Sequence, residues 1–147
     1  MKIIVASDHA GFKLKEQLIA YLESQKYDVV DGGTSSAESV DYPDIGFPAA
    51  EKVADGLVDF GIAICGSGIG MSIVTNKVKG VRAALCTSEN IARLSRQHNN
   101  ANMLILPGRF ISFEEAKKIV DTWLTTKFDG GRHQRRIDKI KKYEERR

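Results

Sequence analysis

Short apolar runs alternate with longer amphipathic segments along nearly the whole chain. The run Lys2–Ser7 (KIIVAS) is almost continuously apolar, whereas Phe12–Ser24 repeats leucine and isoleucine at the three- and four-residue spacing of a helix face. Continuous apolar runs of this length are typical of strands that are covered on both faces, as in a parallel sheet. The pattern therefore predicts five buried strands, at residues 2–7, 27–31, 60–65, 81–86 and 103–106.

The predicted helices lie between these strands and after the last one. Pro43 opens one helix, Ser88 is a candidate N-cap, and Ser112 begins a capping-box sequence. His98 ends another helix, where we expect Asn99 to take the left-handed capping position. The helical segments are 12–24, 44–57, a run after the glycines of 66–70 that reaches 77, 88–98, a segment that starts at 112, and 132 to the C-terminus.

The strict alternation of strands and helices predicts right-handed βαβ units. We therefore expect an α/β fold, a three-layer Rossmann-like sandwich with a five-stranded parallel sheet and a C-terminal helix. The chain has 147 residues, 42% of them hydrophobic, with no internal repeat or linker, and these values predict a single domain over residues 1–147. The longest loop, residues 32–43, ends at Tyr42 and Pro43 and is a candidate binding loop.

The net charge of +3 is unevenly placed. Residues 132–147 contain eight Lys or Arg against three acids, a local charge of +5, so the preceding residues sum to −2. A basic tail favours an anionic partner, for which a phosphate on a small molecule is sufficient, although a solvated helix face gives the same pattern. Tyr143 is the only aromatic residue of this tail. Base stacking has little support, and we expect no nucleic-acid binding.

The two cysteines, Cys65 and Cys86, form neither a CxxC pair nor a disulfide framework. No apolar segment approaches the ~20 residues needed to cross a bilayer, and the N-terminal run has no signal-peptide pattern. We expect a cytoplasmic protein with no membrane partner.

Chemically reactive side chains follow two of the predicted strands. Asp8 and His9 come directly after the first strand, and Cys65 ends the third, just before the glycine-rich run Gly66–Gly70. Because ligands of open α/β sheets bind beyond the carboxyl ends of the strands, this edge is the predicted site.

The run Gly66–Gly70 (GSGIG) is typical of a loop that approaches an anion closely, with a helix N-terminus directly after it. Its spacing is GxGxG rather than GxGxxG, it follows the third strand rather than the first, and no GK[ST] ends it. A nucleotide cofactor is therefore disfavoured, and a tight structural turn explains part of the pattern.

Three further residue types allow two readings each. A helix N-terminus favours the thiolate of Cys65, which could act as nucleophile or base, but a cysteine at a strand end is also common core filler. His98 could be a general acid or a helix cap. Arg132 and Arg136 share one helix face, which suits a phosphate but could equally be a solvated face, while His133 and Arg135 are expected to point elsewhere.

Seven stretches together form a recognisable set. They are residues 7–12 (SDHAGF), 41–43 (DYP), 64–70 (ICGSGIG), 76–77 (NK), 94–99 (LSRQHN), 108–109 (GR) and 130–136 (GGRHQRR). In this order, over essentially the whole chain, they resemble the type B ribose-5-phosphate isomerases of the RpiB/LacAB sugar-phosphate isomerase family.

The resemblance implies interconversion of D-ribose 5-phosphate and D-ribulose 5-phosphate in the pentose phosphate pathway, without metal or cofactor. Cys65 matches the base that moves a proton between C1 and C2. Other members use a glutamate a few residues on, where this chain has Met71. His98 matches the residue that assists ring opening, and Ser67 stands where some relatives have Thr.

The resemblance also implies a catalytic set of Cys65, His98, Ser67 and Asp8. Members are homodimers or dimers of dimers with sites at the subunit interface, and Asn99 and Arg109 match residues that come from a second subunit. The substrate-binding residues are expected to be Asp8, His9, Tyr42, Gly66, Ser67, Gly68, Ile69, Gly70, Asn99, Arg109, Arg132 and Arg136.

The physical requirements of the reaction agree with these residues. Removal of a proton next to a carbonyl gives an enediolate, which backbone N–H groups of the glycine loop can stabilise. The alternatives are an isomerase that prefers a six-carbon substrate, such as allose 6-phosphate or galactose 6-phosphate, and a non-catalytic sugar-phosphate binding module.

Overall fold

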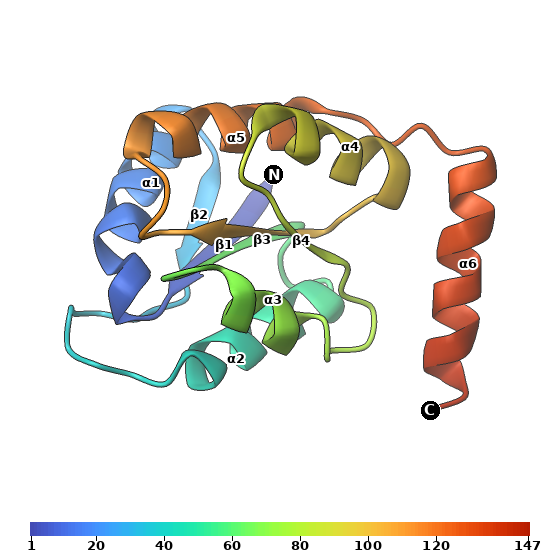
Figure 1. Cartoon of the computed structure of the whole chain (residues 1–147), viewed down its shortest axis with the longest axis horizontal. Coiled ribbons are helices and arrows are strands. Elements are labelled where there is room, and N and C mark those ends of the chain that lie inside the picture. Colours follow the sequence, from blue (N-terminus) through green and yellow to red (C-terminus); the bar gives the residue numbers. More distant parts are fainter.

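The computed structural model describes residues 1–147 and places a five-stranded parallel sheet between two layers of helices (Figure 1). The strand order is β2-β1-β3-β5-β4, so β2 and β4 are the outermost strands of the sheet. This arrangement confirms the predicted fold class. The strands are β1 (Lys2–Ser7), β2 (Asp28–Asp31), β3 (Phe60–Cys65), β4 (Ala83–Leu85) and β5 (Met103–Pro107).

Both faces of the sheet are covered. Helices α1, α4 and α5 lie on one face and α2 and α3 on the other, while α6 stands apart beside the end of α4 (Figure 1). None of them has the length and hydrophobicity needed to cross a bilayer. The helices are α1 (Phe12–Ser24), α2 (Tyr42–Ala54), α3 (Ile69–Thr75), α4 (Glu89–Asn99), α5 (Phe113–Thr125) and α6 (Arg132–Glu145), with a 3-10 turn at His9–Gly11.

Successive side chains of β1 point to opposite faces of the sheet, and both faces are buried, which explains why the sequence of this strand is continuously apolar. Ile3 and Val5 belong to the larger core cluster, which includes α1 and α5 residues, whereas Ile4 and Ala6 belong to the second cluster, which includes α2 and α3 residues. A strand with helices on both faces has no solvent-facing side, so every position buries apolar surface.

Local signals fixed several helix ends as expected. Ser88 accepts a hydrogen bond from Ile91 N–H, and Ser112 forms a complete capping box with Glu115. One capping prediction was wrong: Asn100, with φ 45° and ψ 45°, takes the left-handed position, and Asn99 is the last residue of α4.

Helix α3 ends two residues before the predicted Lys77. The side chain of Asn76 turns back, donating to the carbonyls of Ser72 and Ala83 (3.0 Å each) and accepting from Ala83 N–H at 2.9 Å. The two bonds to Ala83 connect the end of α3 to β4, and the bond to Ser72 closes the last turn of α3.

The register defines the two ends of the sheet. Cys65 of β3 lies opposite Pro107 of β5, and Gly61 lies opposite Met103. We call the end with Cys65 and Pro107 the carboxyl edge, and the end with Gly61 and Met103 the amino edge.

Candidate active site

A cavity of about 340 Å³ opens at the carboxyl edge. It joins residues that follow β1, β3 and β5 to the start of α2, as strand-end reasoning predicted. Seven of its eight lining residues are predicted site residues. They are Asp8, Tyr42, Cys65, Gly66, Ser67, Gly70 and Arg109, and the eighth is Phe110.

Asp8 is held firmly at the end of β1. Its N–H donates to the carbonyl of Ile64 at 3.1 Å. Its Oδ1 accepts from the N–H groups of Ala10 (3.0 Å) and Gly11 (3.2 Å). The carboxylate is therefore fixed in orientation as it lines the cavity, and it caps the turn that follows.

His9 joins this edge to the long loop before α2. Its Nδ1 accepts the backbone N–H of Val40 at 3.2 Å. In a neutral imidazole that accepts at Nδ1, the proton is on Nε2. His9 thus has one free donor, which suits an anionic oxygen.

The ring of Tyr42 packs against the end of the glycine loop and lines the cavity. A Cβ built on Gly70 would lie 2.7 Å from the Tyr42 ring, so only glycine leaves space for this close contact. The candidate binding loop at residues 32–43 therefore does reach the cavity, through its last residues.

Cys65 and Cys86 differ in surroundings. Cys65 is only 4% exposed, yet it lines the cavity at the end of β3. Cys86 is fully buried in the larger core cluster, and burial raises the pKa of its thiol to about 11. Cys86 thus stays protonated at neutral pH, as expected of a structural residue.

The loop after Cys65 presents unused backbone donors. The N–H groups of Gly66, Ser67, Gly68 and Gly70 donate to no other group of the chain, while Ile69 N–H is taken by Ser67 Oγ at 3.2 Å. Gly68 makes this loop possible with a φ of 78°, in the left-handed region. Free N–H groups beside a thiol can stabilise negative charge that develops on a substrate oxygen.

Arg109 lies in the same cavity as Cys65 of its own chain. Its Cδ and Nη1 are each 3.3 Å from the position that a Cβ on Gly66 would occupy, and its N–H donates to Gly66 carbonyl at 3.0 Å. Arg109 of one chain thus already lies beside Cys65 of that chain, whereas the family resemblance implies that this residue comes from a second subunit. The reason is that β5 neighbours β3, so the residues after Pro107 follow directly beside those after Cys65.

The remaining predicted residues lie at the amino edge. Helix α4 starts after β4 and ends at Asn99, four residues before β5 begins. Cys65 and the end of α4 are thus separated along the strand direction by about the four strand steps from Gly61 to Cys65, roughly 13 Å. One chain does not bring them together. We call the group at the junction of α4 and α6 the amino-edge cluster, and it contains His98, Asn99, Asp129, Arg132, His133 and Arg136.

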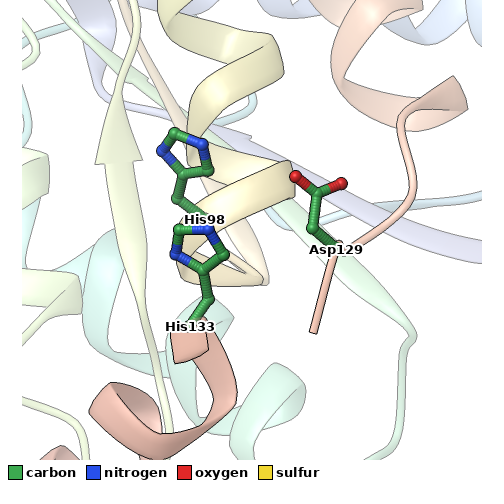
Figure 2. A group of neighbouring side chains, drawn as sticks. All are labelled: His98, Asp129 and His133. Carbon is green, nitrogen blue, oxygen red and sulfur yellow. The ribbon is translucent and has the colours of Figure 1, made fainter. Parts of the chain in front are cut away.

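Within the amino-edge cluster the rings of His98 and His133 stack, with centroids 4.4 Å apart and planes inclined by 10° (Figure 2). His133 thus faces α4, where its ring contacts that of His98. The pKa of His133 is lowered by desolvation and by the positive groups around it, His98, Arg132 and Arg136, while Asp129 opposes the shift. Neutral His133 is thus favoured beside His98.

The potential metal ligands His98, Asp129 and His133 have donor atoms within 4.8 Å of one another (Figure 2). A metal bound by an imidazole nitrogen lies in the plane of that ring. Because the two ring planes are nearly parallel and 4.4 Å apart at their centroids, no single position near both nitrogens lies in both planes. This arrangement is a ring stack rather than a preformed metal site.

Comparison with known proteins identifies the fold family. A sequence profile described as Ribose/Galactose Isomerase matches residues 3–140, nearly the whole chain. The chain belongs to the ribose/galactose isomerase family.

Relatives of this family member match over almost their full length. Ribose-5-phosphate isomerase B of Escherichia coli is 47% identical over 146 residues, covering 99% of this chain and 98% of the relative. A Clostridium thermocellum ribose-5-phosphate isomerase B structure superposes with a TM-score of 0.98 at 50% identity, covering 99% of both chains. A Mycoplasma genitalium ribose-5-phosphate isomerase B with bound ribulose-5-phosphate superposes at 0.95, with 49% identity and coverage of 98% and 96%.

Three residues were not predicted from the sequence as members of the carboxyl-edge cavity or the amino-edge cluster. Phe110 follows Arg109 and is 75% exposed at the cavity, a position that strand-end reasoning reaches but that carries no reactive group. Asp129 and His133 depend on how α6 docks against α4, for which the sequence has no local signal.

Proposed function

We propose that this chain is an aldose–ketose isomerase that interconverts D-ribose 5-phosphate and D-ribulose 5-phosphate. The observation that carries the proposal is the cavity in which Cys65 lies beside the free N–H groups of Gly66, Ser67 and Gly70. The family match and the relatives named ribose-5-phosphate isomerase B support this substrate class, as does the relative with ribulose-5-phosphate bound.

In this proposal the Cys65 thiolate takes the proton from C2 of the open-chain aldose and returns it to C1. Negative charge that develops on the substrate oxygens is stabilised by the loop N–H groups, each worth roughly 3 kcal/mol when preorganised. Ser67 and the fixed carboxylate of Asp8 line the same cavity and exchange protons with the sugar hydroxyls.

Remote binding energy comes from the phosphate. The Nε2–H of His9 and the guanidinium of Arg109 are the cationic or donor groups at the carboxyl edge, and Arg132 and Arg136 are those of the amino-edge cluster. Holding the phosphate positions C1 and C2 at Cys65, which lowers the entropic part of the barrier.

We further propose that a second copy of the chain completes the site in a homodimer. The separation of Cys65 from His98 supports this, because ring opening by His98 needs both at one substrate. A twofold axis can place the amino-edge cluster of one chain against the carboxyl-edge cavity of the other. Exposed apolar side chains beside β4 support an interface there: Ile69 and Ile73 of α3, and Ile91 and Leu94 of α4.

A cytoplasmic location is also part of the proposal. Cys65 and Cys86 are both free thiols, which a reducing compartment maintains.

The direct test replaces Cys65 and measures turnover of ribose 5-phosphate in chelator-treated buffer. Cys65→Ala is expected to lower kcat by about 10²- to 10⁴-fold, the usual contribution of a general base. The matched control is Cys86→Ala, which removes the buried thiol and should keep near-normal kcat. Equal activity in both variants would refute the role of Cys65, and inactivity of the unmodified chain would refute the function.

A further inference from the structure

His98 has few fixed contacts for a residue that must act on a sugar ring. It ends α4 and is half-buried, and no hydrogen bond of the chain reaches its imidazole. An unrestrained side chain at a helix end samples several rotamers, which reduces the fraction of time spent in a productive orientation. The single resolved interaction of this ring is the stack with His133 (Figure 2).

The chain segment before α6 places His133 at this position. Asp129 N–H donates to the carbonyl of Gln97 at 3.0 Å, which fastens the segment to the last turn of α4. Gly130 and Gly131 then turn the chain with φ values of 70° and 58°, in the left-handed region. His133 N–H donates to Gly130 carbonyl at 3.1 Å. His133, the second residue of α6, is thereby placed directly beside His98.

The charges around the pair favour a neutral His133. His98 of α4 and Arg132 and Arg136 of α6 lower the pKa of His133, as does desolvation of its ring. Asp129 of the connecting segment is the nearby acid, and it opposes this shift. A neutral ring can stack on His98 in either protonation state of His98, whereas two imidazolium rings at this distance repel each other. Stacking on a neutral His133 is therefore compatible with both protonation states of His98.

We propose that His133 is a positioning residue for His98, holding its imidazole by ring stacking in the orientation that acts on the sugar. This inference rests on the proposed isomerase function for its catalytic consequence. The ring itself, rather than its nitrogens, performs the task, since neither nitrogen of His133 is hydrogen-bonded within the chain. His133 acts through His98 and does not itself exchange a proton with the substrate.

The test compares two replacements of His133 in the full-length protein. His133→Phe keeps a flat ring and removes the nitrogens, and His133→Ala removes the ring. We expect kcat for ribose 5-phosphate to fall at least about tenfold in His133→Ala, in line with the cost of misplacing a catalytic group, and to return to within about threefold of the unmodified value in His133→Phe. KM should change little in either variant. Gln134→Ala, which removes only an exposed hydrogen bond to Asp138 on the same helix, is the matched control and should leave kcat unchanged.

A second readout does not depend on activity. The chain has three histidines, so their ring protons can be assigned by NMR. Stacking shifts the His98 ring signals upfield, and this shift should be kept in His133→Phe and lost in His133→Ala. An unchanged kcat in His133→Ala overturns the inference, as does a His133→Phe variant as slow as His133→Ala, because the nitrogens would then be required. An unmodified chain with no isomerase activity refutes the proposed function instead, and the NMR shifts then decide whether the stack exists.

Discussion

The split between the carboxyl-edge cavity and the amino-edge cluster can be tested by mixing two inactive variants. Cys65→Ala damages the cavity, and His98→Ala damages the cluster. Each variant alone has a lesion in every site and should have little activity. If a site combines the cavity of one chain with the cluster of the other, a hybrid of the two variants restores one of its two sites, because one site draws on both undamaged halves.

The expected recovery follows from the symmetry. Equal amounts of two chains that exchange freely give hybrids in half of the dimers, and each hybrid has one intact site of two, so the mixture should reach about a quarter of the unmodified activity. The same fraction holds for a dimer of dimers, since the site still belongs to one twofold interface. Recovery should develop at the rate of subunit exchange.

The assay is turnover of ribose 5-phosphate after the two variants are coexpressed or mixed, with the hybrid fraction measured by native mass spectrometry. The matched control mixes Cys65→Ala with Asp8→Ala. Each of these variants is damaged in its own carboxyl-edge cavity and has an intact amino-edge cluster. Every site of that hybrid is damaged, and no recovery is expected. A mixture of Cys65→Ala and His98→Ala that forms hybrids without regaining activity would refute the split site, and so would recovery in the control pair.

Two further predictions concern stability. Gly68→Ala places a side chain at φ 78° and its Cβ 2.5 Å from Leu85 Cδ1, so we expect the free energy of unfolding to fall by about 2–3 kcal/mol, against about 1 kcal/mol for Gly56→Ala, where φ is 73° and no atom lies within 4 Å. Urea unfolding measures both, and equal losses would mean that the contact is relieved at no cost. Separately, the Tyr21 hydroxyl donates to Asp121, which raises the pKa of Tyr21 from 10.0 to about 12. Because the pKa is higher in the folded state, the protonated hydroxyl stabilises the fold at pH values below the unfolded-state pKa, and this stabilisation is lost as the pH rises through the folded-state pKa. The unmodified protein should therefore lose more free energy of unfolding than Tyr21→Phe between pH 10 and 12. Parallel losses in the two proteins would contradict the reasoning.

Much of the fold followed from the sequence because its strands are covered on both faces. Helix α1 has the predicted bounds Phe12–Ser24, since a glycine before it and a regular apolar stripe mark it clearly. Boundaries failed where a side chain competes with the backbone. Asn76 ends α3 through bonds to β4, a contact between segments that local patterns do not contain.

The site was predictable at the carboxyl edge, where topology alone brings strand ends together. Asp8 and Cys65 needed only the parallel order of β1 and β3 to become neighbours. The His98–His133 stack could not be predicted in the same way. It depends on the turn at Gly130 and Gly131 and on the docking of Asp129 against Gln97, which are set by packing between α4 and α6.

The glycine-rich loop has a further consequence for ligand selection. Each of its glycines leaves space that a neighbour fills: Arg109 at Gly66, Leu85 at Gly68 and Tyr42 at Gly70. Glycine is usually associated with flexibility, but here the missing side chains admit other groups so closely that the backbone has little room to move. These close contacts restrict movement of the loop. A ligand must therefore fit the backbone N–H donors in the positions that they already have, and a sugar of the wrong shape is excluded because the loop does not adjust to it.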